Sequence, residues 1–336
     1  MPAPSPGDLH AEAIVIDAVC PLAADRRYLG WYREGGVTVT VPTVATTESA
    51  QSTFRTIAGW KRAIAADPTL MPIRRAGDVT AAKSAGRMGI ALHFQGTAPI
   101  EDDLDLVEVY KELGVGVIGL CYNVKNRVGD GADERTDCGL SHFGVALVKR
   151  LNEAGVIVDC SHTGLRTSLD AIEVSRQPVV LSHSNPCGIH RSRRNVPDEL
   201  IKAIAATGGI IGTAGFPAFL GTETRPTLDR FIDAIAYVAD LVGIDHTGLG
   251  MDYYLGQHEV LPQEQAQAMY DDAVAAGVWR ADTYPPPPHY YPEGISTPRT
   301  LPKLTARMLR RGFGTDEIRK VLGLNWMRLY RTIWGE

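Results

Sequence analysis

The chain reads Val156-Ile157-Val158-Asp159-Cys160-Ser161-His162 in one apolar run and Val179-Val180-Leu181-Ser182-His183 in another, and each run ends at a histidine. Each has the length and the β-branched content of a buried parallel strand. About one helix length separates them. Parallel strands that alternate with helices open their carboxyl ends onto one face, where catalytic residues collect. The two runs therefore predict a parallel α/β fold with His162 and His183 on its functional face.

Strand-like runs recur along the rest of the chain. Counting the two above (156–162 and 178–183), they lie at residues 13–19, 36–44, 89–95, 115–122, 156–162, 178–183, 209–216 and 247–253. Helical patterns lie at residues 47–66, 102–113, 141–154, 163–175, 197–207, 227–242, 301–311 and 316–333. This alternation predicts a closed (β/α)8 TIM-like barrel formed by residues 1–336 as one domain. An open, doubly wound sheet is the alternative, but no GxGxxG or GxxxxGK[ST] motif follows the first strand.

A Pro-rich insertion interrupts this alternation after the eighth strand, from about residue 256 to residue 298. Its middle reads Tyr284-Pro285-Pro286-Pro287-Pro288-His289-Tyr290-Tyr291-Pro292. Two interpretations stay open. The insertion is either a stiff excursion over the surface or a cover for the pocket, since it follows the last strand on the catalytic face.

The charge and the cysteine content of the chain indicate which binding partners and which compartment to expect. The net charge is −5 and no basic stripe occurs, so we expect no nucleic-acid partner and no anionic membrane surface. The first six residues lack the basic and apolar regions of a signal peptide, and no apolar stretch is long enough to span a bilayer. The five cysteines are odd in number and lack CxxC spacing. They predict reduced, mostly buried thiols in a cytoplasmic protein.

Polar residues gather where the predicted strands end. Alternation along the strands places Gln95, Tyr122, His162, His183 and Asp252 on the inward face. Neutral imidazoles and a carboxylate are suitable ligands for zinc or a similar divalent ion, and an open position on that ion leaves room for an activated water. Asp252 has a second candidate role as general acid or base.

A basic segment, Arg191-Ser192-Arg193-Arg194-Asn195-Val196-Pro197-Asp198, follows the sixth strand. It is either a solvated loop that caps the next helix or the source of an arginine at the barrel mouth. In the second interpretation, Arg194 binds a substrate carboxylate through two parallel hydrogen bonds.

Several segments of this chain resemble the renal (membrane) dipeptidase family, the M19 metallopeptidases. They are Gly139-Leu140-Ser141-His142-Phe143-Gly144, Asp159-Cys160-Ser161-His162, Leu181-Ser182-His183-Ser184, Arg194-Asn195-Val196-Pro197-Asp198, Gly208-Gly209, Gly250-Met251-Asp252 and Leu322-Gly323-Leu324-Asn325-Trp326-Met327-Arg328. They keep their order from near Asp17 almost to the C-terminus. The resemblance implies a TIM-like barrel, often dimeric, and a two-metal hydrolase that cleaves dipeptides, including those with a D-residue at the second position.

The resemblance assigns roles to four residues. His162 and His183 match the histidine ligands of one metal, Asp252 matches the carboxylate of the eighth strand, and Arg194 matches the arginine that binds the substrate carboxylate.

The chain departs from the family at three strands. The His-x-Asp ligand pair of the first strand is replaced by Val19 and Pro21, and the bridging glutamate of the third strand by Gln95. A substrate-contacting histidine after the fourth strand is replaced by Tyr122. Without these negatively charged ligands, little would offset the repulsion between two metal cations bound close together. We therefore expect one ion rather than two.

Three functional hypotheses follow. The first is a hydrolase of a dipeptide or similar small amide. It uses one zinc-like ion on His162 and His183, completed by Asp252, Gln95 or water, with Asp252 and Tyr122 catalytic and with Arg194 and Tyr122 binding the substrate. The second is a metal-free or non-hydrolytic barrel enzyme, and the third is a small-ligand-binding protein without catalysis. A homodimer is the expected assembly.

Overall fold

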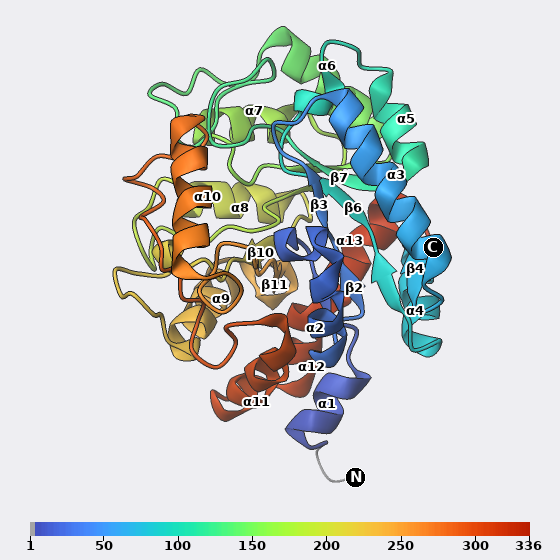
Figure 1. The fold of residues 1–336 in the computed structure, drawn as a ribbon, viewed down its shortest axis with the longest axis vertical. Helices are drawn as coiled ribbons and strands as arrows, with labels where there is room; N and C mark the ends of the chain where they lie inside the picture. Colours follow the sequence, from blue (N-terminus) through green and yellow to red (C-terminus); the bar gives the residue numbers. More distant parts are fainter. Residues whose placement is uncertain (1–3) are drawn as a thin grey trace.

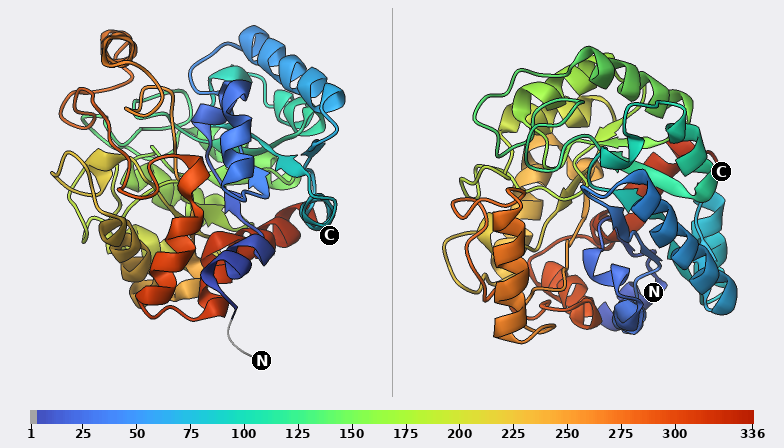
Figure 2. Two further views of the ribbon diagram at one scale, coloured as in Figure 1. Left: turned by 60° about the horizontal axis from the view of Figure 1, so that its bottom comes forward. Right: turned by 45° about the horizontal axis from the view of Figure 1, so that its top comes forward.

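The computed structural model describes residues 4–336 and shows a parallel α/β fold whose helices surround the strands (Figures 1 and 2). The strands are β1 (Ile16–Asp17), β2 (Val39–Thr40), β3 (Thr43–Ala45), β4 (Leu70–Pro72), β5 (Met88–Ile90), β6 (Leu92–Phe94), β7 (Val115–Gly119), β8 (Ile157–Asp159), β9 (Val179–Val180), β10 (Ile211–Thr213) and β11 (Thr247–Leu249). All of their pairings are parallel.

The strands follow one another in the order of a barrel. One sheet has the order β10-β11-β1-β2-β5-β4 and the other β3-β6-β7-β8-β9. The pairs β2/β3 and β5/β6 are halves of single strands, the first interrupted at Pro42, which has no N–H to donate. A parallel bridge between Leu181 and Ile211 links the two sheets on the other side. The predicted α/β barrel is confirmed as two linked arcs, with β4 as an additional edge strand.

The helices are α1 (Pro6–Glu12), α2 (Leu29–Glu34), α3 (Ala50–Ala66), α4 (Ala76–Ser84), α5 (Leu106–Leu113), α6 (His142–Glu153), α7 (Leu165–Val174), α8 (Asp198–Ala206), α9 (Leu228–Val242), α10 (Gln263–Ala275), α11 (Pro302–Arg310), α12 (Thr315–Arg319) and α13 (Asn325–Trp334). Several begin at a side-chain cap; Ser141, for example, accepts a hydrogen bond from Gly144 N–H at the start of α6. Within residues 4–336 no helix is long and apolar enough to cross a membrane.

Two helical features differ from the sequence prediction. Helices α1, α2, α4 and α10 were not predicted, because their apolar faces are short or weak. The single helix predicted over residues 316–333 is interrupted between α12 and α13 by a π-helical turn, Lys320–Leu324. Gly323 allows this turn to pass close to Ile14, because a Cβ there would lie 2.4 Å from the carbonyl oxygen of Ile14. The wider turn thus brings the chain close to the start of β1.

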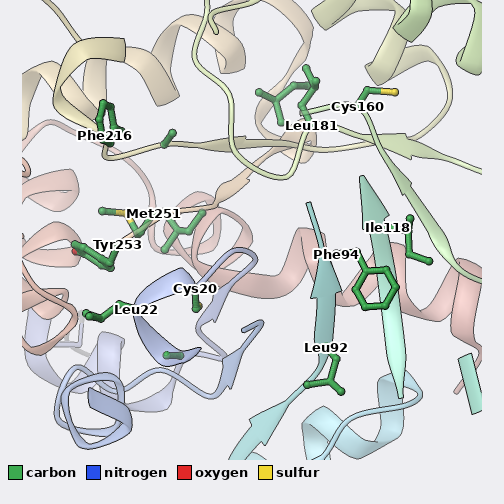
Figure 3. Packing of buried hydrophobic residues seen from close by; sticks show 14 of the residues in the cluster. Cys20, Leu22, Leu92, Phe94, Ile118, Cys160, Leu181, Phe216, Met251 and Tyr253 are labelled. Carbon is green, nitrogen blue, oxygen red and sulfur yellow. The ribbon is translucent and has the colours of Figure 1, made fainter. Parts of the chain in front are cut away.

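Apolar side chains from the strands, from the loops that follow them and from the inner faces of the helices form the core. Figure 3 shows Leu92, Phe94 and Ile118 on β6 and β7, and Met251 and Tyr253 just beyond β11. All five are buried. Burial on both faces explains why the strands read as continuous apolar runs rather than as alternating ones.

Close packing beneath the barrel mouth depends on two glycines. A Cβ at Gly212 or Gly250 would lie 2.0 or 1.8 Å from the carbonyl oxygen of Ser182. These two residues therefore let β10 and β11 approach the loop that carries His183. That approach fixes the backbone of the loop.

Candidate active site

Two histidines meet at the carboxyl ends of β8 and β9. His162 and His183 each lie three residues past the end of their strand. Their Nε2 atoms are 2.7 Å apart, and both rings are buried. The structure thus brings together the pair that the two apolar runs predicted.

The opposite nitrogen of His162 is held by an asparagine. His162 Nδ1 lies 2.7 Å from Asn123 Oδ1. The amide nitrogen of Asn123 donates to the carbonyl of Val278 at 2.9 Å, so the amide oxygen faces the ring. An oxygen can only accept here, and therefore Nδ1 of His162 carries the proton.

A serine and an aspartate hold His183 in the same way. His183 Nδ1 lies 2.8 Å from Ser182 Oγ, whose hydroxyl donates to Asp159. The backbone N–H groups of Ser161 and Ser182 each donate to Asp159 Oδ1 at 2.9 Å, and His93 Nε2 lies 3.3 Å from Oδ2. Because the Ser182 proton is directed to Asp159, its oxygen accepts from His183 Nδ1. Both Nε2 atoms are consequently acceptors with facing lone pairs.

The electrostatics of this group favour neutral imidazoles beside an ionised carboxylate. Burial, reinforced by the positive charge of Arg194, lowers the pKa of both His162 and His183 well below the ordinary value. Burial alone would raise the pKa of Asp159, but His93, His183 and Ser182 outweigh it and hold this pKa below its usual range. Neutral imidazole is the form that binds metal ions.

Asp252 lies at the end of β11 with an unusual backbone. Its φ is +56°, and Asn123 and His162 also have positive φ, at +62° and +64°. Non-glycine residues held in this region cost on the order of 1–3 kcal/mol each and cluster at functional sites. Burial raises the pKa of Asp252 to about 7, an effect that nearby Arg194 opposes and Asp17 reinforces.

Arg194 is a buried cation without a carboxylate partner. It is 2% exposed, and within residues 4–336 no carboxylate oxygen lies within 4.0 Å of its guanidinium. Its Nη2 lies 3.4 Å from the carbonyl oxygen of His183, and the group packs over the ring of Phe219. A buried charge normally needs a counter-ion. An incoming carboxylate would supply it beside the histidine pair.

Tyr122 lies three residues past the end of β7, and Gln95 directly follows β6. The ring of Tyr122 is 4.4 Å from that of His162, and its hydroxyl accepts a hydrogen bond from Trp279 at 3.1 Å. Burial raises the pKa of Tyr122 to about 12. Gln95 is buried and donates to Thr43 Oγ1 at 3.1 Å. The amide of Gln95 is thus engaged with β3, the neighbouring strand.

The first strand offers no metal ligand at the two positions where the family has them. Val19 is fully buried, and Pro21 begins a 3-10 turn, Pro21–Ala24. Among residues 4–336, no group of three or more His, Cys, Asp or Glu side chains is arranged to hold a metal ion. The residues that could hold a metal ion are therefore the two imidazole nitrogens of His162 and His183, which further ligands would have to supplement.

The Pro-rich insertion returns to the barrel mouth over residues 278–291, here called the strap. Trp279 donates to Tyr122, Tyr284 donates to Asn123 Oδ1 at 3.0 Å, and Tyr291 donates to the backbone carbonyl of Asp252. The strap therefore forms hydrogen bonds directly with residues of the candidate site.

Sequence reasoning missed Asn123, Asp159, Ser182 and Tyr284. Asp159 and Ser182 stand inside the two apolar runs, and a polar residue within a buried strand was the available signal for them. For Asn123 and Tyr284 no local signal exists, because their roles depend on a contact between residues 161 positions apart.

Comparison with known proteins identifies relatives of this chain. Residues 31–270 match the family described as membrane dipeptidase (peptidase family M19). An uncharacterised dipeptidase of Schizosaccharomyces pombe is 27% identical over 75% of this chain and 55% of its own length. A dipeptidase of Aspergillus oryzae is 29% identical over 73% of this chain and 52% of its own. The chain spans about half the length of these curated relatives.

Solved structures cover the whole fold. An amidohydrolase from Pseudomonas aeruginosa is 35% identical, with a TM-score of 0.87 over 99% of this chain and 100% of its own. A metallopeptidase from Rhodobacter sphaeroides, liganded with a phosphinate mimic of the dipeptide L-Ala-D-Ala, is 20% identical. Its TM-score is 0.78 over 96% of this chain and 100% of its own, a likeness of fold.

Proposed function

Because the chain belongs to the membrane dipeptidase family, peptidase family M19, we propose that it is a metal-dependent hydrolase of a dipeptide or similar small amide with a free carboxylate. One observation carries this proposal. The buried Arg194 lacks a carboxylate partner within residues 4–336, and its Nη2 lies 3.4 Å from the backbone carbonyl of His183, whose ring faces that of His162. A site for a metal cation near a guanidinium without a counter-ion suits a small substrate that brings its own carboxylate.

The metal is proposed to be a single divalent ion, with zinc as the expected species. His162 and His183 would hold it through Nε2, and Asp252, Gln95 or water would complete the coordination. Bound there, such an ion supplies Lewis-acid polarisation and lowers the pKa of a coordinated water. Val19 and Pro21 argue against a second ion, because neither has a side chain that can coordinate one.

The other residues have separate proposed roles. Arg194 binds the substrate carboxylate and orients the amide. Asp252, with a pKa near 7, accepts the proton that water loses on adding to the amide carbon and returns it to the departing amine. Tyr122 contacts the substrate, and its pKa, raised to about 12 by burial, keeps the hydroxyl protonated near neutral pH, so that it can donate to the oxygen on which charge develops.

We further propose a cytoplasmic homodimer in which residues 1–336 form one domain and the insertion, about residues 256–298, covers the site. The cysteines support the compartment: all five are free, and Cys20, Cys121 and Cys160 are buried, as predicted. The contacts of the strap with Asn123 and Tyr122 support its role as a cover. The dimer rests on the family resemblance.

One observation favours an alternative, a metal-free barrel enzyme or a small-ligand-binding protein. Within residues 4–336 the two histidines lack a third His, Cys, Asp or Glu ligand in the same cluster. In this alternative the strap and Arg194 bind a small carboxylate without hydrolysing it.

The deciding experiment measures metal content and then activity. Elemental analysis of protein purified without added metal is followed by assays with L-Ala-D-Ala and other dipeptides in the presence of zinc, manganese or cobalt. Retention of about one ion per chain together with hydrolysis supports the proposal. Protein that takes up no metal at saturating supply excludes it and favours the alternative.

A further inference from the structure

Tyr284 occupies a central place between the strap and the site. It is 3% exposed and lies flat on the ring of Trp279, with ring centroids 4.6 Å apart and planes 7° apart. The edges of Phe216 and Phe219 contact it at centroid distances of 5.7 and 5.6 Å. This aromatic surround leaves the ring little freedom, so its hydroxyl has a defined position.

The hydroxyl joins the two functional halves of the site. It accepts a hydrogen bond from Arg194 Nε at 3.0 Å and donates one to Asn123 Oδ1 at 3.0 Å. Asn123 Oδ1 in turn accepts from His162 Nδ1. One oxygen on the strap therefore connects the guanidinium proposed to bind the substrate with the imidazole proposed to bind the metal.

The direction of each bond is fixed by chemistry. A guanidinium only donates, and the Asn123 oxygen only accepts. Tyr284 must therefore accept with a lone pair and donate with its proton, which only the neutral phenol does. Burial raises the pKa of Tyr284, so the phenol keeps its proton.

We propose that Tyr284 is a positioning residue that holds Arg194 and, through Asn123, His162 in the geometry needed for substrate and metal. The inference rests on the proposed function for the identity of the ligands. If Tyr284 has this role, the Pro-rich insertion contributes a residue to the active site in addition to covering it. Removing the hydroxyl alone should free Arg194 Nε and leave His162 less firmly oriented.

The test compares Tyr284→Phe with two controls from the same segment. Thr283→Val removes a neighbouring bond, from Thr283 Oγ1 to Asp133, that attaches the strap without touching Arg194 or His162. Tyr290→Phe makes the same chemical change in a tyrosine that contacts His258 and Arg225 instead of the site. Each protein is measured for zinc affinity by titration calorimetry, for kcat and KM on L-Ala-D-Ala, and for thermal stability.

We expect Tyr284→Phe to raise KM by about tenfold to a hundredfold, as befits the loss of a hydrogen bond to a charged group, with a smaller change in kcat. Zinc affinity should fall about fivefold through the loosened His162, and neither control should show these changes. Unchanged KM and zinc affinity in folded Tyr284→Phe would overturn the inference while leaving the proposed function intact. Equal effects in Thr283→Val would also overturn it, because attachment of the strap would then explain them.

The two proposals fail in different ways. If the wild type binds zinc but cleaves no dipeptide, the proposed function is wrong, and the zinc affinities alone decide the role of Tyr284. A wild type that neither binds zinc nor hydrolyses L-Ala-D-Ala overturns both.

Discussion

His162 and His183 present their Nε2 atoms to each other at 2.7 Å while both Nδ1 atoms are already occupied as donors. Two facing lone pairs in a buried site repel unless a cation lies between them. A tetrahedral zinc ion with Zn–N bonds near 2 Å separates two ligand nitrogens by roughly 3.3 Å. A small rotation of the rings would therefore convert this pair into half of a zinc site.

The first prediction concerns metal binding by this pair. His162→Ala and His183→Ala should each abolish retention of zinc, because a single imidazole leaves one protein nitrogen for the ion. Elemental analysis and zinc titration measure the loss. His142→Ala, which removes an exposed histidine at the start of α6, serves as the control and should retain the metal. Undiminished zinc in either site variant means that the ligands have been assigned wrongly.

The second prediction concerns the partner of His183. Ser182→Ala removes the oxygen that accepts from His183 Nδ1 and breaks the connection to Asp159. Zinc affinity should fall about 10- to 100-fold, the usual effect of losing a group that orients a metal ligand. Ser184→Ala is the matched control, since Ser184 Oγ is buried and has no hydrogen-bond partner within residues 4–336. Equal zinc affinities for the two variants would argue against the orienting role of Ser182.

The third prediction concerns Arg194. Replacing it with Ala should lower kcat/KM for a dipeptide about 100-fold, corresponding to about 3 kcal/mol, mainly through KM, with zinc content unchanged. Arg194→Lys should recover little, because a lysine cannot form two parallel bonds to a carboxylate. The neighbouring Arg193, half-exposed and 3.7 Å from Asp282, gives the control variant Arg193→Ala. Steady-state kinetics measure kcat and KM for each variant. A decrease in kcat alone, with KM unchanged, would contradict the proposal that Arg194 binds the substrate carboxylate.

The placement of the histidines could be predicted from the sequence, and their surroundings could not. Long β-branched runs and strand–helix alternation are local signals, so His162, His183 and Asp252 could be located at strand ends from the sequence alone. The strands themselves were predicted too long. The run at residues 13–19 contains only Ile16–Asp17 as regular strand, and a 3-10 turn begins at Pro21.

The residues that orient the histidines depend on contacts between distant segments. Asn123 lies one position beyond the predicted Tyr122, but its role is set by Val278 and Tyr284 in the strap. No periodicity connects these positions. The Pro-rich composition predicted a stiff segment, but it did not predict whether that segment lies on the surface or over the pocket.

The last prediction concerns Asp17, a buried carboxyl beneath the barrel mouth. It is 1% exposed, its Oδ1 accepts from Met251 N–H at 2.8 Å, and within residues 4–336 its Oδ2 has no partner. Burial raises the pKa of Asp17 to about 7, although the hydrogen bond from Met251 opposes the shift. The unfolded chain loses this proton near pH 4.

Between about pH 4 and pH 7 the folded protein thus binds a proton that the unfolded chain has lost, so stability should fall as pH rises through this window. The full loss, reached above pH 7, is about 4 kcal/mol, from about three pKa units at 1.36 kcal/mol each.

Asp17→Asn should reduce this dependence of stability on pH, because it removes the titrating carboxyl. Urea unfolding at pH 5, 6, 7 and 8 measures the free energy of unfolding of both proteins. Asp252 contributes a slope of the same sign, and Asp17→Asn should reduce that slope too, because the charge of Asp17 helps to raise the pKa of Asp252; the difference between the two proteins therefore measures Asp17 together with this coupling. Asp240→Asn, an exposed substitution on α9, should leave the slope unchanged. An Asp17→Asn variant as pH-sensitive as the wild type would show that Asp17 is ionised in the folded protein throughout this range.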